Sequence, residues 1–449
     1  MSERLFGTDG IRGVANEYPM TSEMALRLGR AAGRVFRRDQ STHSILIGKD
    51  TRQSCYMFEY ALTAGLCSMG VNVLLVGPLP TPGVSYIMRS LRTDAAIMIS
   101  ASHNAFQYNG IKFFGPDGFK LADQVEDEIE QLARNDSLTN GGAERIGTAR
   151  RIDDAVGRYI EFAKSSFPRG MRLDGLRIVL DCANGAGYKV GPYTLSELGA
   201  DIIPIAAQPN GQNINLNRGS VHPEEMRATV IRERADLGIA FDGDGDRVVM
   251  ADNDGRLLDG NALLTVLAQD LLERDRLPHK TVATTIMANG GLERALAPWD
   301  GQIVWTKVGD RYVVEAMRAQ GLSLGGESSG HIVLLEHNTT GDALITALQV
   351  LAVMVRRNQP LSVLAGAYQA LPEAHTTVPL NGRPSPSKES LDTVRESAEA
   401  SLNGAGRVVI RPSGTEPIVR VMVQHDSQRT ADEMAAQLAG EIAALSGDH

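Results

Sequence analysis

Cysteine and aromatic residues are scarce in this sequence. Its 449 residues include three cysteines, Cys55, Cys67 and Cys182, and no CxxC pair occurs among them. An odd number of widely spaced cysteines predicts neither a disulfide framework nor a zinc site. Aromatic residues make up 5% of the chain, beside 43% hydrophobic and 22% charged residues, which is ordinary for a soluble α/β protein. A chain of this length is too long for one core, so we expect three or four domains.

Long apolar runs are also absent. The first residues, MSERLFGTDG, lack the apolar core of a secretory signal peptide. The longest apolar stretch, Ile345–Val355, is interrupted by Thr346 and Gln349 and is too short to span a bilayer. We therefore expect a cytoplasmic protein without a membrane partner.

An excess of positive charge is missing too. The formal net charge is −9, so the composition gives no support for a nucleic-acid-binding surface. The sequence contains no GxxxxGKS/T loop and no GxGxxG that opens a helix, so nucleotide binding is not supported either. We therefore expect neither a nucleic acid nor a nucleotide as a partner.

Short β-branched apolar runs alternate with longer helical patterns along most of the chain. This alternation is typical of sheets covered by helices on both faces, so we predict an α/β fold. Ligands of such folds lie outside the carboxyl ends of the strands, where each of the polar loops described below falls. The predicted strands are Ser44–Gly48, Val71–Val76, Asp94–Ser100, Leu176–Leu180, Ile202–Ile205, Leu237–Phe241, Val282–Met287, Ile303–Val304 and a stretch near His331–Leu335.

The C-terminal part of the chain has a different pattern. Two apolar runs, Arg407–Ile410 and Ile418–Gln424, enclose a seven-residue loop and precede a helical pattern over about Arg429–Leu445, which predicts a small α+β unit. Pro372 and Pro379 flank a polar segment just before it, which we interpret as a hinge. The predicted domain boundaries are Asn140–Gly147, the region after Asp254, and Leu371–Pro379.

One serine stands out at the end of a predicted strand. In the run MISASHNAFQYNGIK, Ser102 follows the apolar stretch Ala95–Ile99, is flanked by His103, and has Lys112 just beyond. A serine at the mouth of a strand, beside an imidazole and a cation, is placed to carry or transfer a group. An ordinary turn is the alternative, because Ser and Asn are common turn residues. Three further loops that suit a phosphorylated sugar favour the functional interpretation.

Three aspartates follow the apolar run LGIAF. In the segment FDGDGDR, Asp242, Asp244 and Asp246 alternate with glycines, and Arg247 closes the segment. If this segment is extended, the three side chains point the same way, and the glycines let the backbone approach a ligand closely. Converging carboxylates repel one another unless a cation neutralises them, and oxygen ligands select a hard ion such as Mg²⁺. A solvated acidic turn is the alternative.

The segment GGESSGH suits a sugar. If it is extended, Glu327, Ser329 and His331 fall on one face and offer an acceptor, a hydroxyl and an imidazole to vicinal sugar hydroxyls. A polar turn with a core histidine is the alternative.

The segment RPSGTEP, between the two strands of the C-terminal unit, suits a phosphate. Arg411 and Arg420 supply guanidinium groups, Ser413 and Thr415 supply hydroxyls, and the backbone N–H groups around Gly414 supply further donors. Together these groups predict an anion pocket. A structural hairpin loop with an exposed arginine is the alternative.

The N-terminal segment FGTDGIRG also suits a phosphate. It places Thr8, Asp9 and Arg12 around two glycines. We therefore expect it to lie near the other anion-binding loops.

The order of these motifs resembles that of the α-D-phosphohexomutase superfamily from end to end. FGTDGIRG, ISASHN with NGIKFF, FDGDGDR, and TKVGDRYV ahead of GGESSGH are similar to the bacterial branch that acts on glucosamine phosphates. The resemblance implies three similar mixed-sheet α/β domains and a smaller, mobile α+β C-terminal domain, all around a central cleft. They would span residues 1–155 with the serine loop, 156–254 with the metal loop, 255–370 with the sugar loop and 371–449 with the phosphate loop.

The resemblance also implies roles for single residues. Ser102 would carry a phosphate, Glu327 and Ser329 would contact the sugar, and the loop 411–420 would bind a phosphate. One Mg²⁺ per chain would be held by the serine phosphate and the aspartates. These implied ligands are Ser102, Asp242, Asp244 and Asp246.

The implied reaction converts glucosamine 6-phosphate into glucosamine 1-phosphate, for UDP-N-acetylglucosamine and peptidoglycan synthesis. Phospho-Ser102 would give its phosphoryl group to the 1-hydroxyl, and the 6-phosphate of the resulting 1,6-bisphosphate would return to the serine. Arg247, Lys112 and Arg12 would stabilise charge on the transferring oxygens. Lys112 or His103 would handle the hydroxyl proton, and the sequence does not choose between them. The first phosphate would come from autophosphorylation, a kinase or a sugar 1,6-bisphosphate activator, and a homodimer is implied.

Two positions depart from the family pattern. Ala105 stands where the serine loop usually has proline, and Ser328 occupies the variable position of the sugar loop. The second departure leaves the preference among hexosamine, glucose and mannose phosphates open. Two other classes remain as alternatives: a phosphatase that releases inorganic phosphate from the serine, and a sugar-phosphate sensor without turnover. The intact serine, aspartates and phosphate-binding arginine argue against the sensor.

Overall fold

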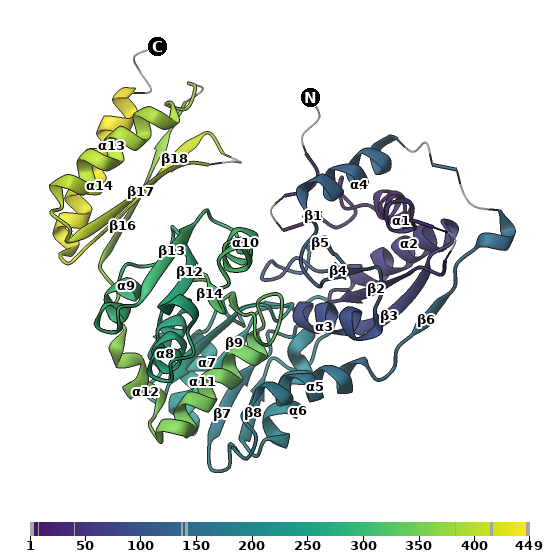
Figure 1. Ribbon diagram of the computed structural model, residues 1–449, viewed down its shortest axis with the longest axis horizontal. Coiled ribbons are helices and arrows are strands. Elements are labelled where there is room, and N and C mark those ends of the chain that lie inside the picture. The colour runs from purple at the N-terminus through teal and green to yellow at the C-terminus, as the bar shows by residue number, and fades with distance from the viewer. Residues whose placement is uncertain are drawn as a thin grey trace.

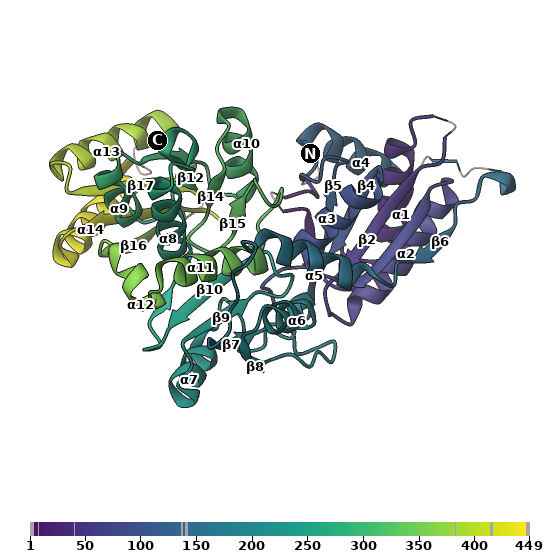
Figure 2. The same ribbon diagram turned by 60° about the horizontal axis from the view of Figure 1, so that its bottom comes forward.

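The protein consists of four units that follow one another along an arc. The structure is a computed structural model that describes residues 4–7, 9–39, 41–135, 138–139, 142–381, 383–413 and 416–445. In these residues there are four sheets, of six, five, four and three strands. The N-terminal unit, in purple, and the C-terminal unit, in yellow, stand at the two ends of the arc in both views (Figures 1 and 2).

The first unit, domain I, is a six-stranded sheet covered by helices. Its elements are β1 (Ile11–Val14), α1 (Ser22–Phe36), β2 (Ser44–Lys49), α2 (Ser54–Ser68), β3 (Asn72–Pro78), α3 (Thr81–Leu91), β4 (Ala95–Ile99), β5 (Tyr108–Phe114), α4 (Asp123–Asn135) and β6 (Ala149–Arg151). The strand order is β1-β5-β4-β2-β3-β6. The pairs among β4, β2, β3 and β6 are parallel, whereas β5 and β1 are antiparallel additions at one edge. Parallel pairing is what the strand and helix alternation predicts.

The second unit, domain II, has a five-stranded sheet. Its elements are α5 (Ala155–Ser166), β7 (Arg177–Asp181), α6 (Val190–Glu197), β8 (Asp201–Ile205), α7 (Glu224–Glu233), β9 (Leu237–Phe241), β10 (Val248–Asp252) and β11 (Leu257–Leu258). The strand order is β11-β10-β9-β7-β8. β9 is parallel to β7 and antiparallel to β10, so β9 and β10 form a hairpin at the centre of the molecule.

The third unit, domain III, has a four-stranded sheet in the order β13-β12-β14-β15. Its elements are α8 (Gly260–Glu273), β12 (Thr281–Thr285), α9 (Gly291–Leu296), β13 (Gln302–Thr306), α10 (Asp310–Gln320), β14 (Leu324–Gly326), β15 (Ile332–Leu334), α11 (Ala343–Arg357) and α12 (Leu361–Leu364). The apolar stretch predicted to be too short for a bilayer lies in α11, which is buried and capped by the Asp342 side chain. In the part of the chain that the structure describes, no helix has the length and apolar content needed to cross a membrane.

The fourth unit, domain IV, is a three-stranded antiparallel sheet with two helices. Its elements are β16 (Glu373–Pro379), α13 (Lys388–Ser401), β17 (Gly406–Pro412), β18 (Ile418–His425) and α14 (Gln428–Leu445). The strand order is β16-β18-β17, and β18 pairs with each neighbour over seven of its eight residues. The prediction of a small α+β unit at the C-terminus is confirmed.

The largest hydrophobic core extends over three domains. This buried cluster includes Leu46 of domain I, Phe241 of domain II and Leu348 of domain III, and domain I has a second cluster around Phe58. Domain IV has a cluster of its own, which includes Val421 and Leu438. Domains I to III therefore share a core that domain IV does not join.

The predicted strands overlap with observed strands, and their ends differ by at most two residues. The prediction lacks the antiparallel strands β1, β5, β10 and β16, among others. The sequence of β5, YNGIKFF, illustrates the reason. Its polar first half hides the strand, and its antiparallel pairing does not follow from the alternation of strands and helices.

The predicted hinge at Leu371–Pro379 is wrong from Glu373 onward, because those residues form β16 and pair with β18. β17 continues to Pro412, which shortens the predicted seven-residue loop to 413–417. The predicted boundary Asn140–Gly147 lies partly outside the described residues, and Ala143–Arg145 forms a short 3-10 turn. The domain limits themselves remain predictions.

Candidate active site

Ser102 lies at the junction of domains I and II. The chain leaves β4 at Ile99 and returns as β5, and in the intervening loop Ser102 has a φ of 51°. This left-handed conformation is uncommon for a serine and is a source of local strain. The residue is buried, and its Oγ donates a hydrogen bond to Oδ2 of Asp242 at 2.6 Å. The serine thus stands at the end of a strand, as expected, and points across the domain junction.

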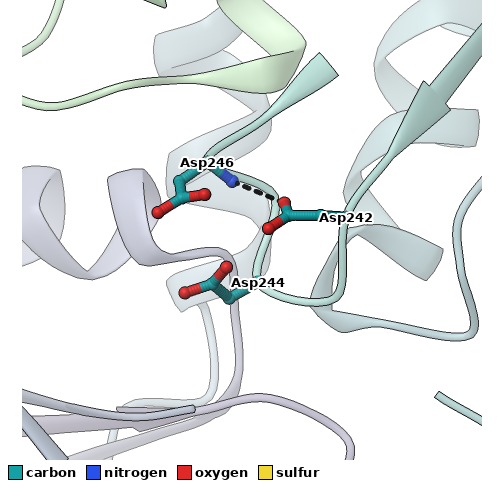
Figure 3. A group of neighbouring side chains, drawn as sticks. All are labelled: Asp242, Asp244 and Asp246. Atoms are coloured by element: carbon teal, nitrogen blue, oxygen red, sulfur yellow. Dashed lines mark hydrogen bonds between the residues drawn. The ribbon is translucent and has the colours of Figure 1, made fainter. Parts of the chain in front are cut away.

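The three aspartates occupy the turn between β9 and β10, and not the extended segment that the sequence analysis expects. The backbone N–H of Asp242 donates to Arg247 O at 3.2 Å, and that of Gly245 donates to Asp242 O at 3.2 Å, so the chain reverses here. Carboxylate oxygens of Asp242, Asp244 and Asp246 nevertheless lie within 4.8 Å of one another, and all three residues are buried (Figure 3). The expected convergence is present, but a tight turn produces it.

The chemistry of this cluster fits a hard divalent cation. Burial and the charges of Asp246 and Asp244 raise the pKa of Asp242 well above its ordinary value. Oδ1 of Asp244 and Oδ1 of Asp246 are buried without a hydrogen-bond partner among the described residues. Carboxylate and hydroxyl oxygens are ligands that Mg²⁺ accepts, and a cation would relieve the repulsion among the carboxylates. Asp242, Asp244, Asp246 and Ser102 could therefore hold one such ion.

Lys112, on β5, reaches the cluster from domain I. Its Nζ donates to Asp244 Oδ2 at 3.0 Å. The same nitrogen lies 3.2 Å from Asp9 Oδ2 and 3.8 Å from Asp246 Oδ2. Burial acts to lower the pKa of Lys112, but the three carboxylates outweigh it and hold this pKa above its ordinary value. Lys112 is therefore a charged ammonium that faces the reacting region.

His103 lies between Ser102 and a guanidinium group. Its Nδ1 is 3.4 Å from Ser102 Oγ and 3.1 Å from Arg247 Nη1. Burial, followed by the charges of Arg247 and Arg12, lowers the pKa of His103 to about 4. The imidazole is therefore neutral near pH 7. Arg12, on β1, forms an ion pair with Asp9 and lies on the same side of the site.

The sugar loop is a tight turn, so the condition for a common face of its three polar side chains, an extended segment, is not met. The N–H of Glu327 donates to His331 O at 2.9 Å, and the N–H of Gly330 donates to Glu327 O at 3.0 Å. The turn separates the side chain of His331 from those of Glu327 and Ser329. Glu327 and Ser329 remain partly exposed at its tip, with Ser329 Oγ 3.3 Å from Glu327 Oε2.

His331 is buried behind this turn, as the core-histidine alternative predicts. Its Nε2 accepts a hydrogen bond from the N–H of Gly341 at 3.1 Å. Its Nδ1 lies 3.6 Å from Asp246 Oδ2, and its Nε2 lies 3.5 Å from Asp310 Oδ2. The structure thus places His331 beside the aspartate cluster and apart from the exposed sugar-loop residues.

Two residues that the sequence analysis does not name as site residues join domains I and III at the cluster. Lys120, which precedes α4, donates to Asp9 Oδ1 at 2.6 Å and to Asp310 Oδ1 at 2.8 Å. Asp310 is the first residue of α10 and belongs to the TKVGDRYV motif, which is the one sequence signal for it. Lys120 has no such signal, because a lone lysine after a strand is typical of an exposed loop.

The phosphate loop presents two neighbouring guanidinium groups. Arg411 on β17 and Arg420 on β18 are directly paired across the hairpin. Burial and the charge of Arg420 lower the pKa of Arg411, and its Nε is buried without a hydrogen-bond partner among the described residues. The N–H of Glu416 donates to Ser413 Oγ at 3.3 Å and closes the loop. The expected contributions of Gly414 and Thr415 lie outside the described residues.

Two cavities lie beside the phosphate loop and the sugar loop. A cavity of about 220 Å³ is lined by Arg411 and Arg420. A second cavity, of about 570 Å³, is lined by Ser328 and Ser329. Met287 and His375 line both cavities, so the two cavities are neighbours, and both are lined by residues of domains III and IV. Neither residue has a sequence signal for this position, because an isolated methionine or histidine is more often part of a core.

Family comparisons agree with this architecture. Four family descriptions match the chain in order: phosphoglucomutase/phosphomannomutase alpha/beta/alpha domain I over residues 3–140, domain II over 157–255, domain III over 259–371, and the C-terminal domain over 352–441. Among solved structures, a phosphoglucomutase/phosphomannomutase family protein from Burkholderia thailandensis superposes with a TM-score of 0.83 at 24% identity, covering 100% of this chain and 98% of that one. At this identity the likeness shows the fold.

An N-acetylphosphoglucosamine mutase from Aspergillus fumigatus, solved with GlcNAc-6P and magnesium, has a TM-score of 0.70 at 18% identity and covers 98% of this chain and 96% of that one. Two curated relatives are much closer in sequence. The phosphoglucosamine mutase of Anaeromyxobacter dehalogenans is 51% identical over 98% of this chain and 99% of its own length. That of Magnetococcus marinus is 54% identical over 95% of this chain and 88% of its own length. The chain therefore belongs to the phosphoglucosamine mutases of the α-D-phosphohexomutase superfamily.

Proposed function

We propose that this enzyme interconverts glucosamine 6-phosphate and glucosamine 1-phosphate, and that Ser102 carries the phosphoryl group between them. The observation that carries the proposal is the contact of Ser102 Oγ with Asp242 Oδ2 at 2.6 Å, in a serine loop strained at the junction of domains I and II. Family membership supports the substrate, since the relatives at about half identity are phosphoglucosamine mutases.

The reaction takes place in two balanced steps. In the first, the bond between phosphorus and Ser102 Oγ breaks, a bond from phosphorus to the sugar 1-oxygen forms, and the proton of the 1-hydroxyl leaves as Ser102 regains one. In the second, the bond between phosphorus and the sugar 6-oxygen of the 1,6-bisphosphate breaks, a bond from that phosphorus to Ser102 Oγ forms, and the proton of Ser102 leaves as the 6-oxygen gains one. The sugar bisphosphate turns over between the two steps. Each of its two phosphates therefore lies once beside Ser102 and once in the site for the non-reacting phosphate.

Lys112 and His103 differ in the role that each can take. Lys112 has three carboxylates within 3.8 Å, so its ammonium is suited to stabilise charge on the transferring oxygens. His103 lies 3.4 Å from Ser102 Oγ, and the same Nδ1 lies 3.1 Å from Nη1 of Arg247, so the imidazole is placed to orient the serine oxygen. Lys112 and His103 both remain candidates for handling the hydroxyl proton. Arg247 and Arg12 add positive charge on the same side.

The residues that would hold Mg²⁺ are Ser102 with its phosphate, Asp242, Asp244 and Asp246. When bound, one Mg²⁺ per chain supplies positive charge that stabilises the transferring oxygens. Without it the three carboxylates would repel a phosphorylated serine, since they approach one another within 4.8 Å.

The non-reacting phosphate is expected to bind at Arg411, Ser413 and Arg420, with Gly414 and Thr415 completing the loop. Two adjacent guanidinium groups bind a phosphate by charge and in either sugar orientation, as a reaction with two orientations requires. Glu327 and Ser329 would contact sugar hydroxyls at the neighbouring cavity, which Ser328 also lines.

Further partners follow from the family resemblance. We expect a sugar 1,6-bisphosphate to act as activator, a homodimer in solution, and the first phosphate on Ser102 to come from the bisphosphate, a kinase or autophosphorylation. A cytoplasmic location agrees with three unpaired cysteines. Each of these expectations is separate from the reaction itself.

The test is a coupled assay for glucosamine 1-phosphate with Mg²⁺ and a trace of glucose 1,6-bisphosphate. We expect Ser102→Ala to be inactive. The matched control is Ser68→Ala, since the Ser68 hydroxyl only donates to Gly65 O within α2. Activity retained in Ser102→Ala would remove Ser102 from the mechanism.

The same assay separates the rival activities. A wild type that is inactive on glucosamine phosphates but active on glucose or mannose phosphates would assign the chain to the rival substrates. Release of inorganic phosphate without isomer formation would indicate the phosphatase alternative, and binding without either product would indicate the sensor.

A further inference from the structure

We propose that Asn215 is a positioning residue for Ser102, because its side-chain amide fixes the serine loop of domain I against the aspartate turn of domain II. Asn215 lies between β8 and α7 and is 5% exposed. Its Nδ2 donates to Ser102 O at 2.8 Å and to Asn104 O at 2.9 Å. The inference rests on the proposed role of Ser102 as the phosphoryl carrier. Asn215 itself acts through Ser102.

A second group holds the same two carbonyls from the other side of the junction. Nη2 of Arg52, in domain I, donates to Ser102 O at 2.9 Å and to Asn104 O at 2.9 Å, and Nη1 donates to Ala105 O. Arg52 is completely buried, and its Nε donates to Asp50 Oδ2 at 2.8 Å. The Ser102 and Asn104 carbonyls therefore each accept one hydrogen bond from domain I and one from domain II.

The contacts within domain I already account for the shape of the serine loop. The N–H of Ser102 donates to Ser100 Oγ at 2.9 Å, and Ser100 Oγ donates to Asp50 Oδ2 at 2.7 Å. Together with Arg52 they hold the left-handed Ser102, a conformation that persists only when its surroundings determine it. Asn215 is not needed to shape the loop, so its contribution is a different one.

The contribution of Asn215 is the link to the aspartate turn. Gly243 lies between two of the aspartates, and a Cβ at this position would lie 2.6 Å from Ser102 O and 2.8 Å from Asn215 Nδ2. The Ser102 carbonyl, the Asn215 amide and the aspartate turn are therefore in direct contact. The N–H of Asn215 donates to Ala183 O at 2.9 Å, which anchors the residue on domain II.

This arrangement predicts a selective effect on turnover. A misplacement of about 1 Å between reacting groups can cost roughly 100-fold in rate. The sugar and phosphate loops belong to domains III and IV, and no hydrogen bond described in the structure joins Asn215 to them. Loss of the Asn215 amide should therefore lower kcat and leave KM for the sugar phosphate nearly unchanged.

The experiment replaces the amide by an isosteric carboxylate, Asn215→Asp, which would place an oxygen against two carbonyl oxygens. We expect kcat to fall about 30- to 100-fold with KM within threefold of wild type. Phosphoserine occupancy, measured by intact-protein mass spectrometry after incubation with glucose 1,6-bisphosphate, should rise more slowly than in wild type. The matched control is Asn217→Asp, an exposed asparagine two residues further along the same loop.

Two results would overturn the inference: kcat within threefold of wild type, or a loss of kcat that matches a loss of folded protein in a thermal melt. If Asn215→Asp does not fold, Asn215→Ala removes the amide without adding a charge and carries the same prediction. Ser102→Ala separates this inference from the proposed function. Activity in Ser102→Ala contradicts the function, whereas an inactive Ser102→Ala beside a normal Asn215→Asp contradicts only the positioning role.

Discussion

The junction of domains I and II and the surface of domain IV both bring together charged groups, but in opposite ways. At the junction, Lys112 and the aspartates are buried and bonded to one another across two domains. On domain IV, Arg411 and Arg420 lie side by side on one hairpin and face a cavity of about 220 Å³. In the first group the Lys112 ammonium is paired with aspartates of the other domain, although Oδ1 of Asp244 and Oδ1 of Asp246 have no hydrogen-bond partner among the described residues. In the second group Arg420 is paired with Glu416 at 2.6 Å, and Arg411 beside it keeps an Nε without a hydrogen-bond partner among the described residues, so an anion would add the missing partner.

The cores show the same contrast. Domains I to III share one buried cluster, whereas domain IV has its own. In the described residues, the hydrogen bonds and ion pairs that join domain IV to the rest all go to domain III, at Asn289, Gly290, Arg294 and Ala288. The groups that react are thus built into a shared core, and the groups that hold the other phosphate are on a unit that packs separately. A reaction in which one substrate binds in two orientations fits this division.

The largest expected effect concerns the aspartate cluster at the junction of domains I and II. Asp244→Asn should lower kcat more than about 100-fold even at saturating Mg²⁺, because it removes a metal-ligating charge. The protein should stay folded, because the buried Lys112 keeps Asp9 and Asp246 as charged partners when Asp244 is neutralised. Steady-state kinetics and a thermal melt measure the two effects. Asp254→Asn, an exposed aspartate just after β10, is the control.

A near-normal rate for Asp244→Asn at saturating Mg²⁺ would contradict the metal role. It would also remove the contrast between the aspartate cluster and the arginines of domain IV, because neither group of charges would then be needed for the chemical step.

The next largest effect concerns the arginines of domain IV that are expected to bind the non-reacting phosphate. Arg411→Gln should raise KM for the sugar phosphate roughly 10- to 100-fold, because a charge-assisted hydrogen bond contributes about 1.5–3 kcal/mol. The change in kcat should be much smaller than for Asp244→Asn, because Arg411 is on a different domain from Ser102. Arg429→Gln, an exposed arginine at the start of α14 and so beyond the end of β18 opposite the phosphate loop, should behave like wild type. A fall in kcat with unchanged KM would place Arg411 among the reacting groups.

A smaller effect concerns the connection between the two parts. Asn289 in domain III is buried, and its Nδ2 donates to Glu373 Oε1 at 2.6 Å and to Leu371 O at 3.0 Å. Asn289→Ala would leave these partners unpaired at a cost of about 1–3 kcal/mol. We expect faster amide hydrogen exchange in β16 and β18, unchanged exchange in β4 and β9, and shifts of only a few-fold in both kcat and KM.

The exposed Asn253→Ala is the matched control for that measurement. Equal increases of exchange in all four strands would show that domain IV is not a separate unit, and the comparison would fail.

The sequence predicts local chemistry better than it predicts geometry. It identifies Ser102, the aspartates and Arg411 because each comes directly after or within an apolar strand, which fixes the edge of the sheet where it lies. It misjudges the backbone of two loops, because the alternation argument holds only for extended chains, and both 242–246 and 327–331 are tight turns. The same error places His331 with the sugar groups, when the turn directs it into the protein.

Contacts between domains cannot be predicted from local sequence patterns. Asn215 and Lys120 are single polar residues in unremarkable surroundings, and their partners lie about 100 or more residues away in the chain. Arg52 follows a predicted strand, but nothing in its vicinity indicates that it holds three carbonyls of the serine loop. Such residues become visible only once the packing of one domain on another is known.

The smallest expected effect concerns the stability of domains I to III. A change in this stability should leave the activity at the candidate active site unchanged. His43, just before β2, is buried between Asp94 Oδ1 and Asp39 Oδ1, each at 3.0 Å, and the bond to Asp94 is the chief cause of its raised pKa. A raised pKa in the folded state stabilises the protein below the unfolded value of about 6.5. This stabilisation is lost as the pH rises through the folded value. His43→Gln should therefore lower the apparent Tm at pH 6 by the equivalent of about 1 kcal/mol, with a smaller difference at pH 9 and no change in kcat. A Tm difference that grows toward pH 9 would show that the imidazole is neutral in the folded protein.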